Sequence, residues 1–221
     1  MLEKPEGVSP EDWDFVVEVV DLIEKMYERR PSEAPPWYGL PRGRESVVRK
    51  WVVKTLVERG YTVLLDAGDT TYVFSKTPLK NRLKGVGWWL PRPGAWKIPT
   101  KKVGEVDLSG LKVVRIPGRP ILYVTPGLVG WMIEGNTYPF RDLLKNLKSY
   151  YTGEAWEMTS LSTEAMSKIL EVADLWTWED DDVIKYIEKI KDMERLLQGR
   201  SGSVEERRLL RLCLGGSIDC V

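Results

Sequence analysis

The chain has 221 residues, with 33 basic and 33 acidic side chains, enough for one hydrophobic core or for one core with a small appended domain. A composition of 43% hydrophobic and 30% charged residues is typical of a globular protein and excludes a disordered or fibrous chain. Histidine is absent, which excludes Ser–His and Cys–His catalysis and histidine metal ligands, and two cysteines alone cannot complete a zinc site. No apolar run is long enough to span a membrane, and residues 1–6 do not resemble a signal peptide, so we expect a cytoplasmic protein without a membrane partner.

Amide side chains are scarce, with one Gln and three Asn, while Glu, Lys and Arg are abundant. This bias is typical of thermophiles and predicts an archaeal or archaeal-virus origin. Cys213 and Cys220 are close enough in sequence to form a disulfide, as intracellular proteins of hyperthermophiles sometimes do, or to remain free thiols.

The first predicted element is a helix from residue 10 to about residue 30. Ser9 is its expected N-cap, Pro10 takes the first helical position, and apolar residues then recur at helical spacing. Residues 31–41 contain several prolines and predict an extended linker.

A second helix is expected over residues 44–59, ended by Gly60. Its apolar positions, among them Val48 and Val52, form the expected buried face, with Arg49, Lys50 and Lys54 on the opposite side. Two β-rich runs, 61–65 and 71–74, then flank a turn at 66–69.

Residues 75–104, called here the Trp-rich segment, contain Pro, Gly and basic residues without clear periodicity and predict a long loop. Strands are expected over 111–116 and 121–125, a helix over 138–151, and a short strand over 155–159. Three further helices are expected over 163–175, 178–197 and 204–213.

This order predicts a mixed α/β or α+β fold, with a small mixed sheet flanked by helices and a helical C-terminal appendage. The expected division is an N-terminal helix with its linker (1–41), an α/β core (42–160) and a helical region (161–221).

Residues 43–67, a helix with an early glutamate followed by Glu-Arg-Gly-Tyr and a strand, resemble the opening of the archaeal Holliday-junction resolvases. The resemblance extends to about residue 151 and implies a restriction-endonuclease-like fold. In that family an Asp and a Glu hold Mg²⁺, and a Lys orients the attacking water. Glu45 matches the helix glutamate here, and Asp107 could match the metal-binding aspartate.

The family's Glu-x-Lys is replaced in this chain by Val124-Thr125-Pro126, which removes one metal ligand and the lysine together. The resemblance therefore implies a degenerate member without strong catalytic activity. A divergent Mg²⁺-dependent nuclease using Glu45, Asp66 and Asp107 stays open as an alternative, and only that alternative requires a cofactor.

The Trp-rich segment carries the main functional hypothesis. Residues 70–120 have a net charge of +9, balanced by −9 elsewhere, and residues 70–104 contain no acidic side chain. Basic side chains neutralise phosphates, and aromatic rings stack on unpaired bases. The candidate nucleic-acid-binding residues are Lys76, Lys80, Arg82, Lys84, Trp88, Trp89, Arg92, Trp96, Lys97, Lys101 and Lys102, extended by Arg141, Lys145 and Lys148 on the helix 138–151.

We therefore expect a protein that binds single-stranded or distorted DNA or RNA without cutting it. Two other interpretations of the tryptophans stay open. In the first, they fill the core, with the lysines as a solvated rim. Alternatively, the Trp-rich segment or the C-terminal helices form an interface with a protein partner or a second copy, in a non-catalytic subunit of a larger nucleic-acid-processing complex.

Overall fold

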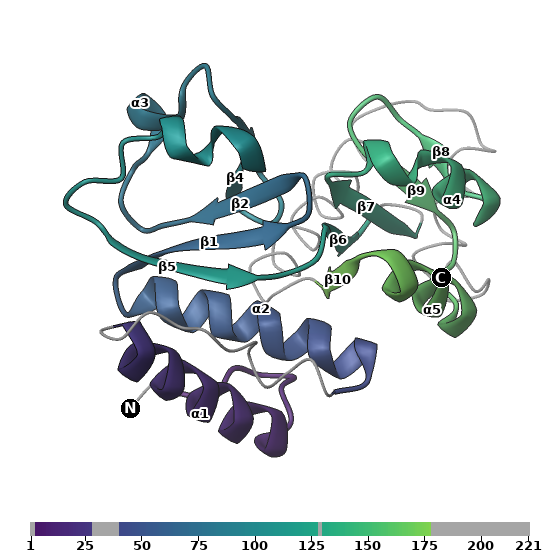
Figure 1. The fold of residues 1–221 in the computed structure, drawn as a ribbon. Helices are drawn as coiled ribbons and strands as arrows, with labels where there is room; N and C mark the ends of the chain where they lie inside the picture. Colours follow the sequence, from purple (N-terminus) through teal and green to yellow (C-terminus); the bar gives the residue numbers. More distant parts are fainter. Residues whose placement is uncertain (1–2, 28–39, 128–129, 178–221) are drawn as a thin grey trace, which may run out of the picture. The chain divides into compact units, whose positions relative to one another are not determined.

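The computed structural model describes residues 3–27, 40–127 and 130–177 and shows an α+β protein (Figure 1). The described residues divide into two compact units, one from the range 1–121 with 169–176 and the other from the range 122–168 with residue 177. This boundary falls inside the range 42–160 that the sequence analysis treats as one core. The reason is that the strands on either side of residue 120 belong to two different sheets.

The first unit contains the larger part of the described chain. Its elements are α1 (Pro10–Tyr27), α2 (Arg42–Glu58), β1 (Tyr61–Ala67), β2 (Thr70–Phe74), α3 (Lys80–Leu83), β3 (Trp88–Leu90), β4 (Ala95–Pro99), the 3-10 helix η2 (Thr100–Glu105) and β5 (Lys112–Pro117). Its sheet has the order β3-β4-β2-β1-β5, with β1 and β5 parallel and the other pairs antiparallel. The end of α5 (Thr163–Val172) and most of β10 (Asp174–Thr177) also belong to this unit.

Helices cover one face of this sheet and a small apolar cluster covers the other. α2 packs on β1, and α1 packs on the outer side of α2 (Figure 1). On the opposite face, Leu64, Val73 and Ile98 from the strands pack with Leu79 and Leu83 from the region of α3. The segment between β2 and β5 therefore forms a second, smaller core of its own.

Local signals for the first two helices are confirmed. The backbone N–H of Asp12 donates to the Ser9 hydroxyl, so Ser9 caps α1. α2 is followed by Gly60, which has a positive φ of 87°. The expectation that Arg49 and Lys50 face solvent is wrong, because both are buried on α2. This helix is enclosed on more than one side, which a single apolar stripe does not indicate.

The long loop expected over 75–104 is also wrong. Those residues form α3, the antiparallel β3–β4 hairpin and η2. The turn of the hairpin, residues 91–94, contains two prolines and ends on Gly94 with a φ of 80°. Strands of three and five residues are too short to show periodicity on either side of such a turn, which is why the pattern suggests a loop.

The second unit is built around the strand order β6-β7-β9-β8. Its elements are β6 (Ile121–Pro126), β7 (Trp131–Gly135), the 3-10 helix η3 (Tyr138–Phe140), α4 (Arg141–Asn146), β8 (Tyr150–Tyr151), β9 (Trp156–Met158) and α5. All three of these pairings are antiparallel. The buried side chains Leu122, Ile133, Leu144, Trp156 and Met158 form its core.

Two helices differ from their expected lengths. The helix expected over 138–151 is shorter, because α4 ends at Asn146. Lys148 then has a left-handed φ of 60°, and Tyr150 and Tyr151 pair with β9 in β8. The helix expected over 163–175 begins as predicted, with Ser162 accepting a hydrogen bond from the Ala165 N–H, but ends at Val172 before β10.

Several expectations lie outside the described residues. These are most of the linker 31–41, the helices 178–197 and 204–213, and the pair Cys213 and Cys220. Among the helices in the described part of the chain, none has the length and apolar character needed to cross a membrane.

Candidate nucleic-acid interface

The β3–β4 hairpin at the edge of the first sheet positions the tryptophans of the Trp-rich segment. Gly87 precedes β3 and lies so close to β4 that a Cβ there would be 2.7 Å from the carbonyl oxygen of Lys97. Trp88 then pairs with Lys97, and Trp89 pairs with Trp96. β4 in turn pairs with β2, where Trp96 is opposite Val73. The hairpin is therefore an extension of the central sheet.

Trp88 and Trp89 lie on opposite faces of this hairpin because successive side chains of a strand alternate. Trp89 shares a face with Trp96, and their ring centroids are 5.8 Å apart with an interplanar angle of 59°. Trp88 shares the other face with Lys97. The exposed fractions of Trp88 and Trp89 are 62% and 51%, so neither ring is part of the core. Trp96 is half-buried against the apolar cluster, so of these three tryptophans it alone agrees, in part, with the interpretation that they fill the core.

A groove of about 470 Å³ lies beside Trp89 and Trp96. It is called here the Trp89 groove, and it is lined by Val73, Ser75, Lys76, Thr77, Pro78, Leu79, Lys80, Trp89 and Trp96. The segment between β2 and α3 forms one side, and the hairpin forms the other. Trp88 and Lys97 are not among the lining residues, which agrees with their place on the opposite face.

Two lysines provide the positive charge of the Trp89 groove, and none of the described residues that line it is acidic. The Lys76 ammonium donates to the carbonyl oxygen of Glu58 at 3.3 Å. Lys80 is exposed at the start of α3 and has no hydrogen bond or ion pair within the described residues. An apolar floor between an aromatic ring and two ammonium groups suits a ligand with a flat ring and a negative charge.

On the opposite face, burial lowers the pKa of the Lys97 ammonium below its ordinary value. This cation is partly removed from water, which disfavours its charged form.

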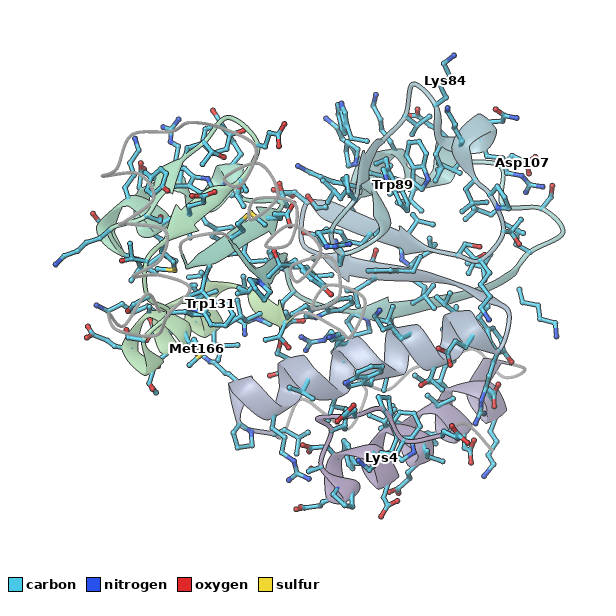
Figure 2. The ribbon with its side chains drawn as sticks, turned by 180° about the vertical axis from the view of Figure 1, so that it is seen from behind. Lys4, Lys84, Trp89, Asp107, Trp131 and Met166 are labelled. Atoms are coloured by element: carbon cyan, nitrogen blue, oxygen red, sulfur yellow. The ribbon has the colours of Figure 1, made fainter. Side chains whose placement is uncertain are left out.

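The other basic residues predicted for this surface are dispersed around the first unit. Arg82 donates to the carbonyl oxygens of Asp107 and Ser109, so it has a structural role in holding that loop. Lys84 projects outward from the turn before β3 (Figure 2). Arg92 lies in the turn of the hairpin, while Lys101 and Lys102 belong to η2, at the end of β4 that pairs with Thr70.

The predicted extension through Arg141, Lys145 and Lys148 belongs to the second unit. All three side chains are exposed. Arg141 lies over the ring of Tyr138, with 5.4 Å between its guanidinium carbon and the ring centroid, and is 3.6 Å from the Asp142 carboxylate. They form a small basic surface of that unit on α4 and the residues following it.

The structure does not bring the three nuclease candidates together. Glu45 is buried and paired with Arg49 on α2. Asp66, at the end of β1, is paired with Arg115 and accepts a hydrogen bond from Thr71 at 2.7 Å. Asp107 lies at the periphery (Figure 2). The hydroxyl and backbone N–H of Ser109 hold the pKa of Asp107 below its ordinary value.

Within residues 3–27, 40–127 and 130–177, no group of three acidic, histidine or cysteine side chains is placed to hold a metal ion. In the resolvase resemblance, residues 120–126 take the place of the strand that carries Glu-x-Lys. In this structure they form β6, which lies in the second sheet rather than beside β2. The geometry therefore does not favour the Mg²⁺-dependent alternative.

Sequence reasoning missed the part of the Trp89 groove formed by Val73, Pro78 and Leu79. A usable signal was present, because Trp88-Trp89-Leu90 and Ala95–Pro99 are two β-compatible runs separated by a four-residue, glycine-ended turn. Comparisons with protein-family models, with curated proteins and with solved structures found no match to this chain.

Proposed function

We propose that this protein binds single-stranded or locally unpaired nucleic acid in the Trp89 groove, without cutting it. The observation that carries the proposal is the half-exposed ring of Trp89, held against Trp96 on one face of a sheet-bound hairpin, with Lys76 and Lys80 on the same groove. A ring in that position offers a flat surface for a base, and the ammonium groups offer contacts for the phosphates on either side of it.

An unpaired strand fits this surface better than a regular duplex. A duplex presents its phosphates and base edges, while its base faces are already stacked on each other. Stacking on Trp89 therefore requires a base that is free of its neighbours. The groove volume of about 470 Å³ lies within the range of sites that hold small organic ligands.

The charge of the surface suits a polyanion. Lys80 has no partner within the described residues, and none of the described residues that line the groove is a carboxylate that would repel phosphates. Displacing counterions from the phosphates then contributes to affinity, and it makes binding strongly dependent on salt.

The test is a titration of the intrinsic tryptophan fluorescence with single-stranded and blunt duplex oligonucleotides at low and high salt, with Mg²⁺ present. We expect saturable quenching by the single strand that weakens steeply as salt rises. The oligonucleotides are then run on a gel, where we expect them to be intact. The absence of binding to any oligonucleotide at low salt would overturn the proposal.

A second candidate function follows from the apolar floor of the same groove. Val73, Pro78 and Leu79 could accept an apolar side chain of a partner protein, as expected for a non-catalytic subunit. Such binding depends little on salt, whereas oligonucleotide binding should weaken steeply as salt rises. Oligonucleotide binding that does not depend on salt, or none at all, would therefore favour this second function.

A further inference from the structure

β3 presents two exposed tryptophans on opposite faces of the hairpin, so a strand of nucleic acid that follows one face meets one of the two rings. Trp88 and Trp89 are adjacent in β3 and project from opposite faces, with 62% and 51% of their surfaces exposed. A strand lying in the Trp89 groove follows one face of the hairpin. A second strand, following the other face, would meet Trp88.

Each of the two aromatic faces has positive charge of its own. Trp89 shares the Trp89 groove with Lys76 and Lys80. Trp88 is directly opposite Lys97 in the β3–β4 register, so these two side chains are neighbours on the other face. The pairing of an aromatic ring with a lysine is therefore repeated, once on each side of the same short strand.

Both rings are accessible, one on each face of β3, as their exposed fractions show. β3 is an edge strand that pairs only with β4 in the described part of the first sheet, and it ends in the proline-containing turn 91–94. β4 fixes it to the body of the sheet through β2. This arrangement, a short anchored strand with one exposed ring on each face, is called here the wedge.

Building on the function proposed above, we propose that the hairpin recognises the junction between a duplex and its two separated strands. Trp89 stacks on an unpaired base of one strand in the Trp89 groove, and Trp88 stacks on an unpaired base of the other strand beside Lys97. The substrate class is then a forked nucleic acid. Apolar side chains inserted at disrupted base steps are an established way for proteins to recognise distorted duplexes.

The experiment compares a forked duplex having two unpaired arms with a single strand and a blunt duplex of matched sequence, using the wild-type chain, Trp88→Ala and Trp89→Ala. The wild type should bind the fork more tightly than the single strand. Trp89→Ala should weaken binding to both, by a factor between about 5 and 150 for each stacked base lost. Trp88→Ala should weaken binding to the fork by a similar factor and leave single-strand binding unchanged.

A fluorescent base analogue, 2-aminopurine, placed at the first unpaired position of either arm reports each contact separately. The wild type should alter the fluorescence in both arms, and each alanine variant should remove the change in one arm only. Trp88→Phe should restore the arm lost in Trp88→Ala. Because both rings are exposed, the variants should keep the melting temperature of the wild type, and this measurement is the control for folding.

The outcomes separate this inference from the function on which it rests. If the wild type binds none of the oligonucleotides, the proposed function itself fails. If the wild type binds the single strand and Trp89→Ala weakens it, the groove function stands. In that case, equal affinities for fork and single strand, or equal losses on both substrates in Trp88→Ala, would overturn the wedge.

Discussion

α2 and the β3–β4 hairpin belong to the same unit, and they reverse the usual distribution of side chains. α2 buries Glu45, Arg49 and Lys50, whereas the hairpin exposes Trp88 and Trp89. Charged residues are rarely buried without partners, and large aromatic residues are usually well covered. Buried charges that have partners inside the protein are explained by the fold. Exposed aromatic rings without such partners point instead to a ligand outside the protein.

The buried charges of α2 have their partners in the fold. Both carboxylate oxygens of Asp174 accept hydrogen bonds from Nη1 of Arg49, at 2.6 and 2.5 Å, and Nη2 of Arg49 donates to Glu45. Burial acts to lower the pKa of Arg49, but Asp174 and Glu45 outweigh it and raise the pKa above its ordinary value. The cluster also joins α2 to β10, where Ser46 donates to the carbonyl oxygen of Leu175.

The largest expected effect comes from breaking the buried cluster. Arg49→Met leaves Asp174 buried without its guanidinium and should lower the free energy of unfolding by about 3–5 kcal/mol. Denaturant unfolding followed by circular dichroism measures this change.

The matched control removes the three charges together, in a chain carrying Glu45→Gln, Arg49→Met and Asp174→Leu. Because no buried charge is then left unpaired, we expect it to recover much of the lost stability. An Arg49→Met chain as stable as the wild type would show that the cluster is not structural.

For the exposed tryptophans of the hairpin we expect the reverse, a loss of binding without a loss of stability. Trp89→Ala should leave the melting temperature almost unchanged, because the ring is half-exposed, yet weaken single-strand binding by about 1–3 kcal/mol. Leu22→Ala, at an exposed apolar position of α1, is the control that should change neither quantity. Thermal unfolding and the oligonucleotide titration give the two readouts. A Trp89→Ala chain that unfolds early would assign the ring to the core after all.

Removing the charge of Lys80 should have a smaller effect on binding, and it tests how far that charge contributes to affinity. Lys80→Ala should weaken binding several-fold and reduce the slope of log affinity against log salt by about one, the value for one lost phosphate contact. Lys25→Ala removes the same charge from an exposed position of α1, and it should leave the slope as it is in the wild type. An equal change in both variants would mean that net charge, rather than the Trp89 groove, drives binding.

The smallest expected effect concerns Lys97 and depends on pH. Its pKa in the folded chain is lowered by burial from an ordinary value of 10.5, so folding is penalised while the ammonium is protonated. The penalty is present at neutral pH and disappears as the pH rises through the folded pKa toward the ordinary value. Lys97→Met should therefore gain stability at neutral pH, and this gain should shrink in alkaline buffer. Denaturant unfolding at a series of pH values measures it, and a gain independent of pH would contradict the burial of the charge.

Much of the local structure could be predicted from the sequence. The Ser9 cap of α1, the Gly60 that follows α2, and the β1–β2 hairpin closed at Gly68-Asp69 all match their expected places. Caps and tight turns depend on residues that are neighbours in the chain, so their signals are contained in a few consecutive positions.

The candidate site was predicted only in part. The tryptophans and lysines of the Trp-rich segment were identified, but the hairpin that orients them was not, because three- and five-residue strands around a proline turn show no period. Nothing in consecutive residues indicates that Trp89 pairs with Trp96 while Trp88 faces the other way. The burial of Arg49 likewise depends on Asp174, which is distant in the sequence.

Composition and local spacing were sufficient for the α+β class, the absence of histidine chemistry, the helix caps and the basic, aromatic character of residues 75–104, because these properties depend on residue type and short-range geometry. Strand pairing over long separations determined the rest. It split the range 42–160 between two sheets, placed Asp174 beside Arg49, and set Trp88 and Trp89 on opposite faces. The physical reason is that a side chain's face and burial follow from the partner strand, and that partner is selected by the packing of the whole unit.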